Sequence, residues 1–438
     1  MIKKLFFPAL LFLGLSLSAQ NNDIAKDEQF TIHAQTTIVN QNKLGFSAKY
    51  SDENSLTTDE ENQTSLTSTL YLGARLWKGA SVYLNPEIAG GSGLSKACGV
   101  AASTNGETFR VGDPQPKIYL ARLYYRQLFA LTDSKSTVET DINQLGGNVP
   151  DKYLGLTVGR ISVADFFDCN EYSHDPRTQF LSWGLMSTGA YDYPANTRGY
   201  TPSVVVEYVS PKHELRYGVS LVPLTANANE MNWDIANSTS HVLEYTHKHI
   251  VKGNTGAIRI LSFFTTTNMG NYNESVIKNP TNPDIESTRA KGRTKYGFAL
   301  NAEQQLNSYT GCFFRASWND GNNETWAFTE IDRSLSAGLS ISGDKWKRKN
   351  DRIGIAQVIS GLSKPHRDYL AAGGKGFMLG DGQLSYANEC LTETYYSAEL
   401  VKNQLYLTGS YQLLFNPGYN KDRQGPVNVF SVRLHLEI

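Results

Sequence analysis

The chain has 438 residues, and 41 Lys and Arg residues nearly balance 42 Asp and Glu residues, so that the formal charge is -1. No basic stripe stands out, and nucleic acid is therefore not an expected partner. The mean hydropathy is negative at -0.38, and no stretch after the first twenty residues is apolar over the length of a membrane-spanning helix. These features exclude a helical membrane protein.

The N-terminus predicts a cleaved secretory signal peptide over residues 1–20. Lys3 and Lys4 precede an apolar run over residues 5–17, and small residues close the segment. The run is too short to cross roughly 30 Å of hydrocarbon, which argues against a membrane anchor. Residues 21–438 are then expected to form a single exported domain.

Apolar and polar residues alternate with period 2 along the rest of the chain, and this pattern predicts β-strands. Within 213–222, the apolar residues Leu215, Tyr217, Val219 and Leu221 occupy every second position. Such strands present one face to lipid and the other to water. In chain order, the sixteen candidate strands span residues 28–38, 65–77, 79–90, 117–127, 152–163, 197–209, 213–222, 239–250, 254–267, 293–305, 308–318, 333–341, 351–361, 389–401, 403–415 and 427–438.

The connections between these strands sort by length. Even-numbered strands are followed by tight links such as 210–212 and 402–403, whereas odd-numbered strands are followed by long polar loops such as 164–196. Short turns on one side and long loops on the other are typical of an outer-membrane barrel with both termini in the periplasm. Two links depart from this pattern, because 128–151 is too long for a periplasmic turn and 342–350 is intermediate.

Period 2 also occurs in half-buried soluble sheets, so a β-sandwich is the alternative fold. The loop lengths and the even strand count favour an all-β fold, a transmembrane antiparallel up-and-down β-barrel of about sixteen strands. The 24 Tyr and 19 Phe residues suit the aromatic girdles of such a barrel. The last strand alternates up to Ile438 and resembles the terminal strand read by the barrel-insertion machinery, which is therefore an expected partner during biogenesis.

Several long stretches together resemble one family. They are GRISVADFFDCNEYSHDPRTQFLSWGLM from Gly159, GAYDYPANTRGYTPSVVVEY from Gly189, HRDYLAAGGKGFMLGDGQLSY from His366, NGETFRVGDPQPKIYLARLYYRQ from Asn105 and NPGYNKDRQGPVNVFSVRLHLE from Asn416. Taken in order, they make the chain similar to the OprB-type carbohydrate-selective porins of the bacterial outer membrane. The resemblance implies a sixteen-stranded barrel that passes glucose and related sugars without an energy source.

The resemblance also implies that the third long loop, near 164–196, folds into the lumen and narrows it. Sugar passage requires groups that replace hydration hydrogen bonds, and flat rings that lie against the apolar faces of a pyranose. The candidate constriction and sugar-binding residues of this loop are Asp165, Asp168, Glu171, His174, Asp175, Arg177, Trp183, Tyr191, Asp192 and Tyr193.

Charged residues on the strands supply a second set of candidates. An Arg that faces lipid at the bilayer midplane costs about 2 to 4 kcal/mol, so these charges are expected to point into the lumen. Charges of both signs across a pore favour polar, uncharged solutes. The candidate lumen-lining residues are Arg75, Glu87, Arg122, Arg126, Arg216, Glu244, Glu303, Glu393 and Glu399.

Other chemistry has weaker support. Carboxylates beside His174 could form a metal or hydrolase site, but Asp175-Pro176 after the histidine is a common turn signal. A loop packed by its own aromatic rings, without a ligand, is the third interpretation. We expect no cofactor and no metal.

The four cysteines, Cys98, Cys169, Cys312 and Cys390, match no zinc spacing. Three disulfide pairings are open, and free thiols or one loop disulfide are favoured over metal ligation.

The sequence therefore predicts an outer-membrane porin for passive diffusion of small carbohydrates such as glucose, surrounded by outer-membrane lipid. A homotrimer is a possible assembly. The alternatives are a general unselective porin and, with less support, an outer-membrane barrel hydrolase that uses His174.

Overall fold

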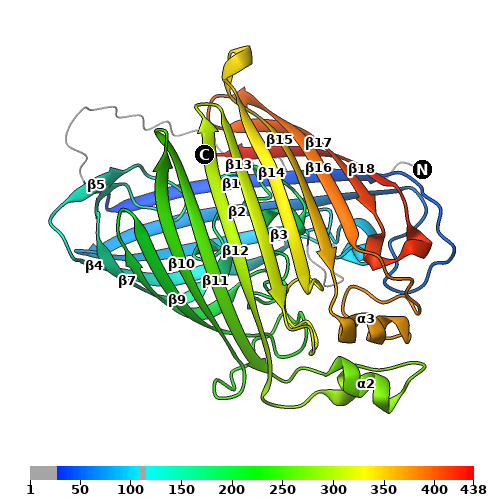
Figure 1. The fold of residues 1–438 in the computed structure, drawn as a ribbon. Helices are drawn as coiled ribbons and strands as arrows, with labels where there is room; N and C mark the ends of the chain where they lie inside the picture. Colours follow the sequence, from blue (N-terminus) through cyan, green and yellow to red (C-terminus); the bar gives the residue numbers. More distant parts are fainter. Residues whose placement is uncertain (1–26, 109–114) are drawn as a thin grey trace.

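The computed structural model describes residues 27–108 and 115–438. These residues form one closed barrel of sixteen antiparallel strands and a separate two-stranded sheet (Figure 1). The predicted barrel class is thereby confirmed, whereas the predicted signal peptide over residues 1–20 lies outside the described residues.

Each of the sixteen predicted strands corresponds to one barrel strand, with ends that differ by a few residues. The separate sheet contains β5 (Lys135–Val138) and β6 (Gly147–Pro150). The barrel strands are β1 (Phe30–Lys43), β2 (Glu61–Trp77), β3 (Ala80–Gly90), β4 (Lys117–Ala130), β7 (Tyr153–Ile161), β8 (Thr201–Val209), β9 (His213–Leu221), β10 (Thr239–Val251), β11 (Asn254–Thr267), β12 (Arg293–Asn307), β13 (Thr310–Asn319), β14 (Arg333–Gly343), β15 (Arg348–Gly361), β16 (Glu389–Val401), β17 (Leu405–Phe415) and β18 (Val427–Glu437).

Every barrel strand pairs with its neighbours in the chain, and β1 closes the barrel against β18. The closing register sets Gln35 opposite Glu437 and Lys43 opposite Val429. The first strand therefore extends beyond its predicted end at residue 38, because its later residues continue the ladder with β18. Closure satisfies the backbone groups that an open sheet edge would leave unpaired in lipid.

The alternation of the sequence appears as two faces of the barrel wall. In β18, Phe430, Val432 and Leu434 are exposed on the outside, whereas Arg433 and His435 are buried on the inside. Apolar side chains thus meet lipid and polar ones line the lumen, as period 2 requires.

The long loops lie at one end of the barrel and carry the helices. Ser363 caps α3 (Lys364–Ala371), and Asn271 caps α2 (Tyr272–Lys278) by accepting a hydrogen bond from the first turn. The two helices lie side by side at this end (Figure 1), and the ring centroids of Tyr272 and Tyr369 are 5.1 Å apart. Among the described residues, no helix is long and apolar enough to cross a membrane.

The two links that departed from the predicted pattern have visible causes. Residues 131–152 contain the β5–β6 hairpin, which pairs outside the barrel sheet. The link between β14 and β15 is a short 3-10 turn, η4 (Asp344–Trp346), and the β14–β15 register shifts beside it at Ser342 and Gly343.

The lipid-facing side of β12 allows a matched test of the membrane position. Leu300, in the middle of the strand, and Leu306, near its end, are both exposed on the outer face. Replacing Leu300 by Arg should lower the free energy of unfolding by about 2 to 4 kcal/mol, whereas the same change at Leu306 should cost about 0 to 1 kcal/mol. Urea unfolding from lipid vesicles measures both values, and equal costs would contradict this placement in the membrane.

Candidate functional site in the barrel lumen

Residues 162–200, which connect β7 to β8, cross the inside of the barrel, and we call them the third loop. They carry η2 (Val163–Asp165) and the short helix α1 (Trp183–Met186). The third loop bonds to Arg122 of β4, Glu393 of β16 and Arg433 of β18. It therefore spans the lumen and contacts widely separated parts of the wall.

Carboxylates of the wall hold the backbone of this loop. Glu393 accepts hydrogen bonds from the N–H groups of Leu181 and Ser182 at 2.7 and 3.0 Å. Glu244 of β10 accepts one from the N–H of Asp168 at 2.7 Å. These bonds satisfy backbone N–H groups of the loop that would otherwise be buried without a partner.

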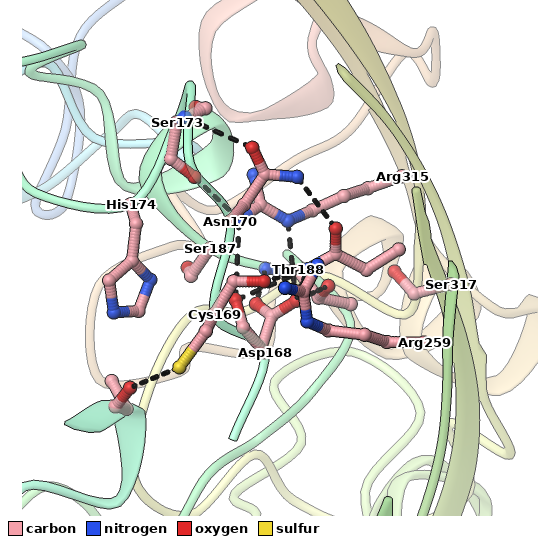
Figure 2. A network of polar contacts seen from close by, with 12 residues as sticks. Asp168, Cys169, Asn170, Ser173, His174, Ser187, Thr188, Arg259, Arg315 and Ser317 are labelled. Atoms are coloured by element: carbon pink, nitrogen blue, oxygen red, sulfur yellow. Dashed lines mark hydrogen bonds and ion pairs between the residues drawn. The ribbon is translucent and has the colours of Figure 1, made fainter. Parts of the chain in front are cut away.

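Asp168 and Arg315 form the centre of a buried polar network beneath the loop (Figure 2). Arg315 Nε of β13 lies 3.2 Å from Asp168 Oδ1, and Asn301 Nδ2 of β12 donates to the same oxygen at 2.7 Å. The Thr188 N–H and hydroxyl donate to the two carboxylate oxygens at 2.5 and 2.6 Å. Arg315 also donates to the carbonyl oxygens of Leu185 and Ser173. This network joins both limbs of the third loop to the wall.

Arg177 joins the third loop to the opposite wall and to a second loop, residues 91–116. Its Nε lies 3.1 Å from both carboxylate oxygens of Glu107, and its Nη2 lies 3.0 Å from Glu87 Oε2 of β3. Its Nη1 donates to Tyr71 at 3.0 Å. The planar guanidinium is thus held on several sides, as its donor fork allows. The buried Tyr200 hydroxyl also donates to Glu87, at 3.0 Å.

The aromatic candidates of the third loop are packed against another loop and against the barrel wall. Trp183 is 8 % exposed, and its ring lies 5.4 Å from that of Phe328. Tyr191 is 3 % exposed and lies 5.0 Å from the Phe263 ring, while Tyr193 lies 4.2 Å from the ring of Phe328. These rings contribute to the packing of the loop interior.

Asp192 has a similar structural position. Its carboxylate accepts hydrogen bonds from the N–H groups of Trp326, Ala327 and Phe328 at 2.8 to 2.9 Å. Lys295 Nζ lies 3.6 Å away. With both oxygens used, Asp192 fixes the loop between β13 and β14 against the third loop.

His174 and Asp175 form the turn at the middle of the third loop. Asp175 accepts hydrogen bonds from the Arg177 N–H and the Thr178 hydroxyl, which is the geometry of the predicted turn. The His174 Nδ1 is buried without a hydrogen-bond partner among the described residues. Burial and the nearby positive charge of Arg315 lower the pKa of His174 below its ordinary value of 6.5.

Two other loop candidates reach water. Asp165 and Arg122 form a forked ion pair with contacts of 2.6 and 2.7 Å, and Asp165 stays solvent-accessible. Glu171 lines a polar cavity of about 540 Å³ that extends from the third loop to the short turns. Burial and the neighbouring Glu303 raise the pKa of the Glu171 carboxyl.

A chain of ion pairs runs along the inner wall from β4 to β10. Arg126 of β4 lies 2.5 Å from Glu207 of β8, and Arg216 of β9 lies 3.2 Å from the same carboxylate. Arg216 also pairs with Glu214, which in turn binds Lys248 of β10. We call these five residues the charged wall. Both signs of charge thus face one side of the lumen, which is the arrangement that suits polar solutes.

The remaining strand candidates differ in position. Glu87, Glu244 and Glu393 are at most 1 % exposed and hold loops. Glu303 bonds to Arg259 at 2.9 Å and to the Glu171 N–H at 2.7 Å. Arg75 and Glu399 lie at the short-turn end. Arg75 donates hydrogen bonds to the carbonyl oxygens of Glu28 and Gly146. Glu399 accepts one from the N–H of Asn403.

Several important residues were missing from the sequence-based candidates. Glu207, Arg259, Arg315 and Arg433 point inward from their strands. Their signal was the same as that of Arg126, a charge between lipid-type neighbours. Glu107 gave no such signal, because it lies in a loop without periodicity.

All four cysteines are free. Within 27–108 and 115–438, no three or more His, Cys, Asp or Glu side chains gather closely enough to hold a metal ion.

A protein-family model for the carbohydrate-selective porins of the OprB family matches residues 53–437. The chain belongs to this family. Solved structures share its fold: the high-pH structure of Pseudomonas putida OprB has a TM-score of 0.71 at 14% identity and covers 94% of both chains. The low-pH structure of the same protein has a TM-score of 0.50 at 12% identity and covers 94% of this chain and 93% of that chain. The outer-membrane channel DcaP of Acinetobacter baumannii gives 0.50 at 10% identity, over 93% and 97%.

Comparison with curated protein sequences gave no match. Membership of the OprB family confirms the predicted porin function, passive sugar diffusion and the outer-membrane location. The lumen described above is therefore the transport path of a carbohydrate-selective porin.

The buried Asp168–Arg315 pair provides a test of how the loop is held. Arg315→Met leaves Asp168 buried without its charged partner and should lower the free energy of unfolding by about 3 to 5 kcal/mol. The double change with Asp168→Asn should recover much of this loss, because no charge then remains unpaired. Thermal unfolding in detergent measures the single and the double variant. Arg352→Met is the matched control, since Arg352 lines the open cavity; a loss as large as that of Arg315→Met would contradict the special role of the buried pair.

The lowered pKa of His174 predicts a pH dependence. As the pH falls below 6.5, the unfolded chain takes up a proton at this site before the folded chain does, so stability decreases until the lower folded pKa is reached. His174→Gln should remove this part of the acid destabilisation. Unfolding midpoints measured from about pH 7.5 to 5 report it, with His213→Gln on the outer face as the control. Identical pH profiles for His174→Gln and the unsubstituted protein would refute the assignment.

Proposed function

We propose that small neutral sugars such as glucose cross the barrel through the gap between the third loop and the charged wall. The observation that carries this path is the exposure of Asp165, Glu171 and Arg126 to solvent beside a loop whose carboxylates Asp168 and Asp192 are buried. From this gap a sugar would enter the polar cavity of about 540 Å³ and continue toward the short turns.

The chemistry of the gap suits hydroxyl groups. Carboxylates accept and guanidinium groups donate, so a sugar hydroxyl finds both kinds of partner within one narrow region. We assign sugar contact to Arg122, Asp165 and Arg126, and in the cavity to Glu171 and Arg177. Because Arg122, Asp165, Arg126 and Arg177 already take part in ion pairs, a passing sugar exchanges partners with them without being held tightly.

Aromatic side chains that line the cavity could stack against a sugar ring. Tyr172 of the third loop, Tyr309 beside β13 and Tyr406 of β17 line it, and each offers a flat face to a pyranose. Trp183 and Tyr191 are buried in the loop interior instead. We therefore assign these two, together with Asp168, Asp192 and the other buried carboxylates, to positioning the loop.

Two alternatives were raised by the sequence. A general unselective porin would share the barrel and differ only in discrimination between solutes. A hydrolase would need His174 to work with a carboxylate, and its ring makes no hydrogen bond to one among the described residues. The channel proposal, unlike the hydrolase, also accounts for the exposed ion pair and the polar cavity beside the third loop.

The homotrimer stays a prediction. Its best candidate contact is the outer face of β1 and β2, where Thr36 bonds to Ser68 at 2.9 Å and Asn40 bonds to Thr64 at 2.8 Å. Polar groups are unusual on a face that meets lipid, and contact with another copy would shield them. Crosslinking in membranes, followed by electrophoresis, would show three-chain products.

Liposome swelling tests the proposed function. Glucose should enter vesicles that contain the protein faster than protein-free vesicles, and faster than a disaccharide or a charged amino acid. Replacing both members of the accessible pair, as Arg122→Gln with Asp165→Asn, should reduce this discrimination because the gap loses its fixed hydrogen-bonding groups. Arg333→Gln, at the outer end of β14, is the matched control.

Glucose entry equal to that of protein-free vesicles would refute sugar transport. Entry at equal rates for all three solutes would favour the unselective porin.

A further inference from the structure

The β5–β6 hairpin occupies the end of the barrel opposite to the helices. It lies within residues 131–152, which connect β4 to β7, and its two strands pair only with each other. Figure 1 shows β5 at the far end of the barrel from α2 and α3. This link departed from the expected length of a periplasmic turn, and the path proposed above does not use it.

The tip of the hairpin, residues 139–146, turns into the mouth of the barrel. The Thr140 hydroxyl lies 2.9 Å from that of Thr31 and 3.1 Å from His33 Nε2, both on β1. Asn85 of β3, which is 0 % exposed, donates to the Asn143 side-chain oxygen at 2.9 Å. The tip therefore contacts inward-facing side chains, not the outer surface of the barrel.

An apolar side chain and a backbone clamp fix this position. Leu145 is 5 % exposed and belongs to a buried cluster that includes Tyr83 of β3 and Tyr124 of β4. Next to it, the Gly146 carbonyl accepts hydrogen bonds from the Glu28 N–H at 3.0 Å and from Arg75 Nη2 at 3.2 Å. Burial of an apolar side chain stabilises a folded segment, and it anchors the hairpin tip to the inner wall.

An opening lies beside the tip. A cavity of about 510 Å³ lies between Thr140 and Asp141 of the hairpin and the adjacent rim of β1, β18 and the β16–β17 turn, which contributes His33, Lys402 to Gln404, Glu437 and Ile438. Asn403 and Glu437 also line the cavity beneath the third loop. A solute that leaves the first cavity toward the short turns therefore passes the hairpin tip.

The charges at this exit are mainly acidic. Asp141 and Glu437 line it, with Lys402 as the one lysine or arginine among its lining residues. Glu139, two residues before Asp141, is also exposed. Carboxylates at a narrow pore mouth favour cations over anions.

We propose that the β5–β6 hairpin forms a second selective constriction at the periplasmic exit, which limits solute size and disfavours anionic solutes such as sugar acids and sugar phosphates. This inference rests on the proposed transport path. It adds a filter in series with the third loop, assigns specificity to Asp141 and Glu437, and assigns the anchoring of the hairpin tip to Leu145.

Removal of the hairpin tests the size limit. Deleting residues 134–150 joins Asp133 to Asp151, and the Leu131 N–H to Lys152 carbonyl bond of 2.9 Å still closes the turn. Single-channel conductance should rise, and a disaccharide should enter liposomes faster. A deletion could disturb insertion into the membrane, so a full-length variant tests the same point. Asn143→Ala with Leu145→Ala loosens the tip and should also raise the conductance and the entry of the disaccharide. Thr137→Ala, on the exposed part of the hairpin, is the control.

Neutralisation of the exit tests the charge filter. Asp141→Asn with Glu437→Gln should shift the reversal potential in a salt gradient toward anions and raise the entry of a sugar acid relative to glucose. Asp133→Asn removes one charge from the same link outside the exit and should leave the reversal potential unchanged.

Unchanged conductance and disaccharide entry in both hairpin variants would overturn the size limit, and an unchanged reversal potential in the neutralised variant would overturn the charge filter. Glucose uptake by the unsubstituted protein is measured in the same assay. If the unsubstituted protein takes up glucose and these results are obtained, only the hairpin constriction is refuted. If it takes up no glucose, the proposed function itself is refuted.

Discussion

The structure depends on a repeated interaction in which an inward-facing carboxylate accepts hydrogen bonds from loop backbone N–H groups. A loop inside a barrel has no sheet or helix to satisfy its amides, and each buried unpaired amide costs free energy. Glu393 holds the third loop in this way, and Glu389 holds the second and last loops through the N–H groups of Ala101, Ala102 and Gly418. The third loop can cross the lumen because the wall supplies these acceptors.

This use of carboxylates also shapes the solvent-facing surface of the path. Glu244 and Glu393 are at most 1 % exposed, so their carboxyl groups bind loop amides instead of solutes. The groups left at the gap are mixed pairs such as Arg122 with Asp165 and Arg126 with Glu207. Carboxylates and arginines therefore anchor the loop where they are buried and face the solute where they are exposed. A passing sugar meets charges that are already paired.

The same distinction explains what the sequence could predict. Period 2 depends only on which face meets lipid, so all sixteen strands were found from it, and it predicts charges such as Arg126 on the inner face. The role of a loop residue depends on partners distant in the chain. Asp192 and Asp165 look alike in sequence, yet three amides from residues 326–328 surround one and a single arginine meets the other. Trp183 likewise has the composition of a sugar platform and the environment of a core residue.

The two constrictions differ in how firmly they are held, and this difference bears on where the path can change. The third loop is fixed by a buried ion pair, by Arg177 and by charged acceptors in several strands. Fewer charged groups hold the hairpin tip: its bonds to Thr31 and Asn85 are neutral, Leu145 is buried beside them, and Arg75 and Glu28 supply the charge-assisted bonds at Gly146. Charge-assisted bonds are about twice as strong as neutral ones. Local opening follows the weaker set of contacts, so fluctuations of the path are expected at the periplasmic exit before they reach the third loop.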